Sequence, residues 1–168
     1  MVGQGLYPRF DIVEYLPTHE TKDYTTRSLK DITGIVVHHT ATGQGYRPLD
    51  AAEYHVNTKD YPGIAYHSMI APDGTRFKTN YDSTISYHAG AECNVKTIGI
   101  ALIGNFDRHR LTVDQKFALL EELELYGVAY RVEFSEVVGH RSCMSTRCPG
   151  KHLDMDLVRA SYRFVVGL

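Results

Sequence analysis

Two segments that carry metal-binding side chains lie far apart in this chain, and any fold that joins them is strongly constrained. An apolar run, residues 35–37, ends in the pair His38 and His39, and the second segment contains His140 and Cys148. Two imidazoles and one thiolate are enough protein ligands for a catalytic zinc ion, because the fourth tetrahedral position stays open for water. The sequence therefore predicts a Zn²⁺ site built from residues 140 − 38 = 102 positions apart.

The individual histidines are weaker indicators than the cysteine. Adjacent residues of a strand point to opposite faces, so only one of His38 and His39 can face a given site. A single histidine at a strand end is more often a hydrogen-bonded structural residue than a ligand. The corner Cys148-Pro149-Gly150 is more specific, because a rigid, partly desolvated turn suits a bound thiolate. For Cys93 and Cys143, the ordinary behaviour of free cysteine favours buried, unbonded thiols.

Length and charge limit the function classes. A chain of 168 residues with 43% hydrophobic residues suits one domain, residues 1–168, with an N-terminal arm (1–31) and a core (32–168). A net charge of −2 argues against a nucleic acid partner. The longest apolar runs, such as 98–103, are too short for membrane insertion, and residues 1–10 lack the pattern of a secretory signal. We expect a monomer.

Hydrophobic patterning and turn residues predict alternating strands and helices. Strands are expected at 32–38, 65–71, 76–80 and 97–103, with a hairpin turn at 72–75. Helices are expected at 49–57, from Thr112 onward, and at 153–166. This order predicts an α/β fold, with a central mixed β-sheet flanked by helices and the zinc site in a surface groove.

The helix that begins at Thr112 is the clearest of these elements. Thr112 and Gln115 have capping-box spacing. Apolar residues at steps of three and four predict one buried face, formed by Val113, Phe117, Leu120, Leu123, Gly127 and Tyr130. Three glutamates fall mostly off this face and are expected in solvent: Glu121, Glu122 and Glu124. In the last helix, Leu157, Ser161 and Phe164 share one side.

Several motifs then occur in one order along the chain. They are Val37-His38-His39-Thr40-Ala41, Tyr66-His67, Pro72-Asp73-Gly74-Thr75, His88-Ala89-Gly90, Thr97-Ile98-Gly99-Ile100, Gly104-Asn105, and Gly139-His140-Arg141 through Cys148-Pro149-Gly150. In this set the chain resembles the zinc-dependent N-acetylmuramoyl-L-alanine amidases of the type 2 family, which includes phage endolysins such as T7 lysozyme and the animal peptidoglycan recognition proteins. The resemblance covers roughly residues 32–160.

The resemblance implies a role for each matching residue. It implies zinc ligands at His38, His140 and Cys148, which leaves His39 as a structural residue on the opposite face. It implies a catalytic tyrosine at Tyr66. The second catalytic position is lysine in some members and threonine in others, and here it is Thr146, so a role that needs a lysine cation does not carry over. Three further positions match residues near the substrate groove, namely His67, His88 and Asn105.

The function that this resemblance implies is hydrolysis of the amide between N-acetylmuramic acid and L-alanine in bacterial peptidoglycan. Without a visible signal sequence, the chain looks most like a phage endolysin, made in the host cytoplasm before lysis and acting on the cell wall. A bacterial recycling or autolytic amidase is the second choice, and the animal immune branch is disfavoured because its close cysteine pairing is missing. A non-catalytic recognition module, or a scaffold that binds another protein, are the remaining alternatives.

Overall fold

A six-stranded mixed sheet forms the centre of the protein in the computed structural model, which describes residues 5–167. The strand order is β1-β4-β3-β5-β2-β6. All neighbouring strands are parallel except β3 and β4, which pair antiparallel. The strands are β1 (Arg9–Asp11), β2 (Gly34–His39), β3 (Ser68–Ile70), β4 (Arg76–Lys78), β5 (Thr97–Leu102) and β6 (Val137–Gly139). The sheet and its helices confirm the predicted α/β class.

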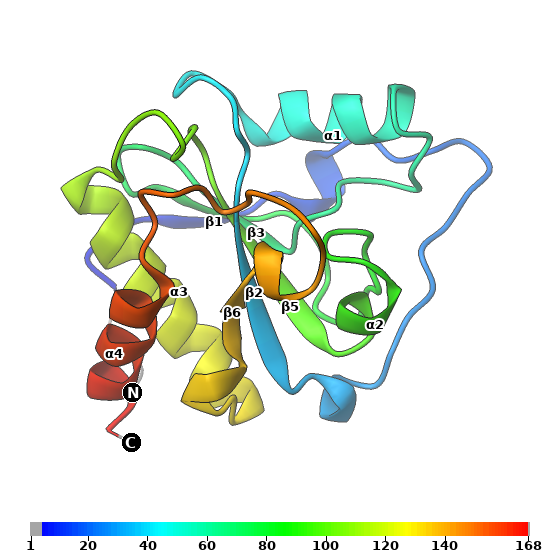
Figure 1. Cartoon of the computed structure of the whole chain (residues 1–168). Helices are drawn as coiled ribbons and strands as arrows, with labels where there is room; N and C mark the ends of the chain where they lie inside the picture. The colour runs from blue at the N-terminus through cyan, green and yellow to red at the C-terminus, as the bar shows by residue number, and fades with distance from the viewer. Residues whose placement is uncertain (1–4, 168) are drawn as a thin grey trace.

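Helices cover both faces of this sheet. Figure 1 shows α3 and α4 together on one face, and α1 and α2 on the other. Their bounds are α1 (Pro48–Asn57), α2 (Ala91–Asn94), α3 (Val113–Tyr130) and α4 (Met155–Val166). Within residues 5–167, no helix combines the length and the apolar character needed to cross a membrane.

The two longest strands, β2 and β5, lie side by side inside the sheet and contribute to a core on each of its faces. Every residue of both strands is buried. Because side chains alternate along a strand, Ile35 and Val37 face α3 and α4, where they join the larger apolar cluster. On the other face Ala101 packs with residues of α1 such as Ala52. His38 pairs with Ala101 across the ladder and shares its face, toward α1.

The predicted hairpin between β3 and β4 is confirmed. Asp73 Oδ1 accepts a hydrogen bond from the backbone N–H of Thr75 at 2.9 Å. Gly74 adopts φ +83°, a conformation that L side chains rarely take. The turn therefore reverses the chain as the residues Pro-Asp-Gly-Thr predict.

The start of α3 matches the prediction, but the buried face does not. Thr112 and Gln115 form the capping box, with Thr112 Oγ1 accepting from the Gln115 N–H at 2.9 Å. Val113 and Phe117 are 63% and 52% exposed, so the expected apolar face was wrong at its N-terminal end. Glu122, expected in solvent, is fully buried. The helix is therefore rotated relative to the predicted face.

Glu122 is buried because polar partners surround its carboxylate. Ser68 Oγ donates to Oε1 at 2.7 Å. Arg9 Nη2 lies 3.2 Å from Oε1, and Arg76 Nη1 lies 3.5 Å from Oε2. A buried charge persists only when it is paired and hydrogen-bonded. This cluster also attaches β1 to α3, so the N-terminal arm, expected as a wrapping segment, contributes an edge strand to the sheet.

The apolar side expected for α4 was also wrong. Leu157 and Phe164 are exposed, and Tyr162 is the buried residue instead. Its ring packs on Gly127 of α3, where an added Cβ would lie 2.1 Å from the Tyr162 oxygen. Its hydroxyl donates to the Val132 carbonyl at 2.6 Å. The close approach of the two helices at Gly127, together with this hydrogen bond, decides which side of α4 faces inward.

Candidate metal centre

Three side chains with metal-binding atoms meet at the carboxyl end of β2 and β6. His38 is the fifth residue of β2, and His140 immediately follows β6. Val37 pairs with Gly139 in the ladder, so the two histidines leave the sheet at the same edge. After His140 the chain turns back and places Cys148 near the two histidines. One potential ligand atom from each of His38, His140 and Cys148 lies within 4.8 Å of the others.

The geometry around His38 assigns its two ring nitrogens to different neighbours. Nδ1 lies 3.7 Å from Cys148 Sγ, and Nε2 lies 3.0 Å from His88 Nδ1. The His38 and His140 rings are 4.6 Å apart between centroids. His38 therefore presents Nδ1 to the cysteine sulfur, while its other nitrogen is occupied by His88.

His39 points to the opposite face of β2. Its Nδ1 accepts a hydrogen bond from the backbone N–H of Phe106 at 3.1 Å. Its backbone N–H donates to Cys148 Sγ at 3.4 Å. His39 thus supports the sulfur through its backbone, while its imidazole anchors the loop after β5.

Burial sets the protonation of the three candidate ligands. It is the main cause that lowers the pKa of His38 well below its usual value, followed by the neighbouring His88 and His140. Burial also lowers the pKa of His140. It raises the pKa of the Cys148 thiol to about 11, and the hydrogen bond from the His39 backbone acts in the opposite direction. Both imidazoles are therefore neutral at pH 7, which is the form that binds a metal.

These residues fit a zinc ion. Two neutral imidazoles and one thiolate form a set that zinc accepts, and three protein ligands leave one position open. Among residues 5–167, the buried Nε2 of His140 has no hydrogen-bond partner. Leaving a buried polar atom unpaired is costly, so an ion or water is expected at this ring. A cation would also favour the thiolate form of Cys148 despite its burial.

Tyr66 lies beside the three candidate ligands. Its ring centroid is 5.3 Å from that of His38, and it precedes β3 instead of lying within it. It lines a pocket with Tyr46, Tyr54 and His55. Burial is the main cause that raises the pKa of Tyr66 above its usual value of 10, followed by Cys148. The phenol therefore keeps its proton at neutral pH and can donate a hydrogen bond.

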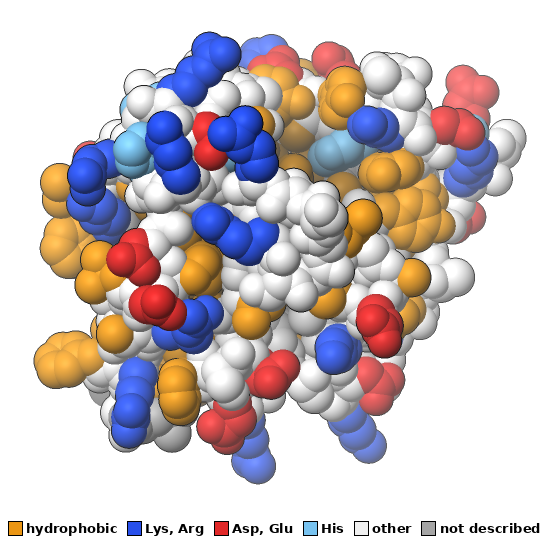
Figure 2. Space-filling model, viewed as in Figure 1, with side chains coloured by type: hydrophobic (Ala, Val, Ile, Leu, Met, Phe, Trp, Pro, Cys, Tyr) orange, Lys and Arg blue, Asp and Glu red, His pale blue; other side chains and the backbone are white. Residues whose placement is uncertain are grey.

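Thr146 is exposed and lies in the loop that carries the cysteine. Its Oγ1 accepts a hydrogen bond from the backbone N–H of Cys148 at 3.3 Å. The exposed Arg141 and Arg147 belong to the same segment. Figure 2 shows several Lys and Arg side chains in the upper part of the face that it presents, and others along its lower edge. The loop thus combines a hydroxyl near the sulfur with positive charge in solvent.

The three residues expected in the substrate groove occupy different environments. His67 is fully buried, with Nδ1 accepting from the Gly99 N–H at 3.0 Å and Nε2 donating to the Thr84 carbonyl at 2.9 Å. His88 is 5% exposed and contacts His38. Neither imidazole is open to a substrate, which corrects the expectation for both. Asn105 is half-buried, and its Oδ1 accepts from the Asp107 N–H at 3.1 Å.

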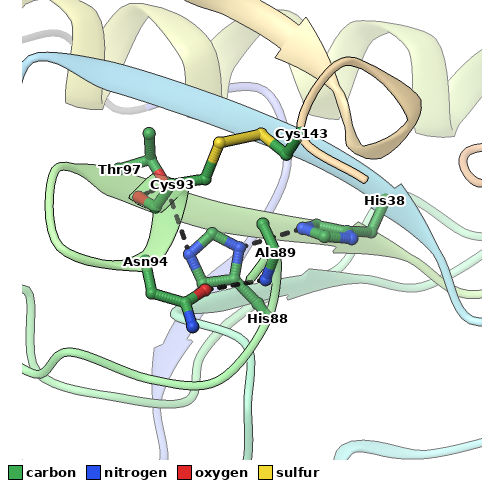
Figure 3. The surroundings of a disulfide bond; sticks show 7 residues. All are labelled: His38, His88, Ala89, Cys93, Asn94, Thr97 and Cys143. Carbon is green, nitrogen blue, oxygen red and sulfur yellow. Dashed lines mark hydrogen bonds between the residues drawn. A yellow bond between two sulfur atoms is a disulfide. The ribbon is translucent and has the colours of Figure 1, made fainter. Parts of the chain in front are cut away.

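The expectation that Cys93 and Cys143 are unbonded thiols was wrong. They form a disulfide that joins α2 to the loop between His140 and Cys148 (Figure 3). The partners are 50 residues apart, so their pairing could not be read from local spacing. The position of Cys143 between two candidate ligands was the one available indication. The link between His38 and His88 was also missed, because His88 was expected to contact substrate.

This chain is similar to known proteins in both sequence and fold. The family model described as N-acetylmuramoyl-L-alanine amidase matches residues 28–151. Peptidoglycan-recognition protein SC2 of Drosophila melanogaster is 31% identical over 130 residues, which covers 70% of this chain and 68% of that protein.

Two solved structures, one of an amidase and one of an endolysin, have the same fold. The N-acetylmuramoyl-L-alanine amidase LysC from Clostridium intestinale URNW superposes with a TM-score of 0.73 at 25% identity, covering 86% of this chain and 95% of that one. The Ph2119 endolysin from Thermus scotoductus MAT2119 bacteriophage Ph2119 gives a TM-score of 0.77 at 25% identity, covering 92% and 98%.

Proposed function

Because this chain belongs to the type 2 N-acetylmuramoyl-L-alanine amidase family, we propose that it is a zinc-dependent hydrolase of bacterial peptidoglycan. The bond cleaved is the amide between N-acetylmuramic acid and L-alanine. One observation carries the proposal: His38, His140 and Cys148 bring three ligand atoms within 4.8 Å of one another, with Tyr66 next to them. A structural metal site would use four protein ligands, whereas this set leaves one position for the reaction.

In this proposal, each residue around the site has a different role in the reaction. A zinc ion held there would supply an acidified water and polarise the scissile carbonyl. Tyr66 keeps its phenolic proton and donates a hydrogen bond to the carbonyl oxygen as negative charge develops on it. Thr146 holds the backbone of Cys148 and offers a neutral hydroxyl, which can orient water but is a poor base. Thr146 occupies the position that is lysine in some members of the family. It carries no positive charge, so it cannot take a role that needs a lysine cation.

The proposed partner is bacterial peptidoglycan, and the proposed setting is lysis by a phage. The similarity to the Ph2119 endolysin supports this setting, and the similarity to the Clostridium LysC amidase supports the bond cleaved. Exposed basic side chains on the loop that carries Cys148 suit a polymer whose stem peptides bear carboxylates.

Recognition of peptidoglycan without cleavage is the second candidate function. It is favoured by the similarity to proteins named as peptidoglycan-recognition proteins. The two functions predict different outcomes with purified cell walls. A recognition module sediments with the walls and leaves them intact, whereas an amidase releases peptides that begin with L-alanine.

Metal removal tests the catalytic proposal. Purified protein is expected to contain about one zinc per chain. Chelation should abolish peptide release from purified walls, and added zinc should restore it. Mass spectrometry of the digest from walls with diaminopimelate and walls with lysine identifies the bond cleaved and the stem peptide preferred. Full activity after thorough chelation would rule out the zinc mechanism.

A variant pair separates loss of the metal from a general defect. Cys148→Ser removes the thiolate and is expected to lose zinc and activity together. His19→Gln changes a histidine near the surface that pairs with Asp60 and lies outside both segments that carry the candidate ligands. This control should keep zinc content and activity at the level of the unmodified protein.

A further inference from the structure

A chain of hydrogen bonds runs from the candidate ligand His38 to the backbone of the disulfide-bonded Cys93. His38 Nε2 lies 3.0 Å from His88 Nδ1. His88 Nε2 lies 3.3 Å from Thr97 Oγ1, and Thr97 Oγ1 lies 2.7 Å from the Cys93 carbonyl oxygen. Figure 3 shows the His88 ring between Thr97 and His38, with the disulfide of Cys93 beside them. Both imidazoles are buried, so each is shielded from exchange with bulk water.

The direction of each hydrogen bond in the chain follows from the group at its Cys93 end. The Cys93 carbonyl oxygen can only accept, so Thr97 donates its one hydroxyl proton in this short contact. Thr97 Oγ1 must then accept from His88, which places a proton on His88 Nε2. A neutral imidazole carries one N–H, so His88 Nδ1 is bare and accepts from His38 Nε2. His38 therefore carries its proton on Nε2, and its bare Nδ1 faces Cys148 Sγ.

The position of His88 is itself built into the fold. Its ring lies against Gly99 of β5, where an added Cβ would come within 2.7 Å of Cγ and Nδ1. The following residue, Ala89, donates its backbone N–H to Asn94 Oδ1 at 2.7 Å. Cys93 in α2 is fixed to Cys143 by the disulfide. The ring of His88 is thus held on one side by a strand and on the other by a cross-linked turn.

From this geometry we infer that His88 and Thr97 are positioning residues that set the tautomer of His38, so that Nδ1 is the nitrogen available to a metal. The inference rests on the proposed function, because it assigns His38 as a ligand. Hydrogen bonds from a ligand histidine to a second residue fix the ring and its tautomer, and their loss weakens metal binding by roughly 10- to 100-fold. His88 thus acts through His38, and the substrate is not its partner.

The first test reads the tautomers directly in metal-free protein. Long-range ¹H–¹⁵N correlation spectra distinguish a histidine protonated on Nε2 from one protonated on Nδ1. We expect both His38 and His88 to carry the proton on Nε2. A proton on Nδ1 of either residue would overturn the inference. This measurement needs no variant and no bound metal.

The second test removes one hydrogen bond while keeping the shape of the side chain. Thr97→Val lacks the hydroxyl, and Thr97→Ser keeps it as a matched control. We expect Thr97→Val to bind zinc about 10-fold more weakly in competition with a chelator, and Thr97→Ser to match the unmodified protein. Equal zinc affinity in Thr97→Val and Thr97→Ser would show that the Thr97 hydroxyl does not set the tautomer of His38.

The third test displaces the His88 ring with one variant and replaces the residue with two others. Gly99→Ala forces the ring away from β5, and His88→Asn retains an oxygen near the position of Nδ1. Weaker zinc binding is expected for Gly99→Ala and His88→Leu, with partial recovery in His88→Asn. If His88→Asn binds zinc as weakly as His88→Leu, packing of the ring is what matters and the inference fails.

Failure of the inference is distinguishable from failure of the proposed function. If the unmodified protein binds no zinc, the proposed function fails, and the tautomer spectra still decide the hydrogen-bond chain. If it binds zinc and cleaves walls while His38 carries its proton on Nδ1, the function stands and only the positioning role is lost.

Discussion

Tyr66 is the residue whose contribution can best be separated from metal binding. Tyr66→Phe removes only the hydroxyl, while the ring contact with His38 remains. Removing one hydrogen-bond donor to a developing oxyanion lowers kcat by roughly 100- to 1,000-fold. We expect this loss in the rate of peptide release, with zinc content unchanged. Activity within a few-fold of the unmodified enzyme would show that the Tyr66 hydroxyl does not contact the reacting carbonyl.

His55, in the pocket beside Tyr66, makes stability depend on pH. Its Nδ1 accepts from the Ala65 N–H at 3.1 Å, and burial, followed by Lys59, lowers its pKa to about 4. The unfolded chain binds a proton near pH 6.5 and the folded chain does not, so stability is retained above pH 6.5 and lost as the pH falls toward 4. At pH 5 the loss from this residue is about 2 kcal/mol.

The control for this effect is His55→Asn, which keeps an acceptor for the Ala65 N–H but does not titrate. Urea unfolding at pH 7 and pH 5 should show a smaller decrease in the variant, by about 2 kcal/mol. If both proteins lose the same stability over this interval, His55 is not the group that takes up the proton.

The attachment of β1 to α3 depends on the buried carboxylate of Glu122. Glu122→Gln removes the charge that pairs with Arg9 and Arg76 while keeping nearly the same volume. Breaking a buried ion pair by neutralising one partner costs about 3 kcal/mol. We expect this loss of unfolding free energy in urea. Glu124→Gln on the exposed side of the same helix is the matched control, with a change within about 0.5 kcal/mol.

The elements differ in how well the sequence predicts them. The strands β2 and β5 follow from β-branched runs, the hairpin from Pro72 to Thr75, and the start of α3 from its capping box. The strand β1 is three residues long and acquires its pairing from β4, so no local pattern reveals it. The rotation of α3 was mispredicted because Arg9 and Arg76, distant in sequence, neutralise the charge of Glu122.

The residues of the site also divide into those that the sequence predicts and those whose contacts depend on distant parts of the chain. The grouping of His38, His140 and Cys148 was predicted from an ordered set of motifs, and the alternation of a strand separated His38 from His39. The environment of His88 was not predicted, because it depends on a gap at Gly99 and on a turn closed by the disulfide. Such contacts arise only when the sheet has assembled.

The disulfide between Cys93 and Cys143 joins two segments that lie far apart in the sequence. Its closed loop of about 50 residues corresponds to a stabilisation of about 4 kcal/mol in the chain-entropy model. It also links the turn after His88 to the segment that precedes Cys148. Because the cytoplasm keeps thiols reduced, a chain made there gains this stabilisation only after it reaches an oxidising compartment.

The double variant Cys93→Ser with Cys143→Ser is expected to have its unfolding midpoint at a lower urea concentration. Its unfolding free energy should be reduced by about 2 to 4 kcal/mol. A phosphine reductant should bring the unmodified protein to the same midpoint and leave the variant unchanged, because Cys148 alone cannot form the cross-link. Zinc affinity measured in parallel should also fall in the variant, since the loop from His140 to Cys148 loses its anchor. An unmodified protein whose midpoint does not respond to reductant would show that the disulfide does not contribute to folding stability.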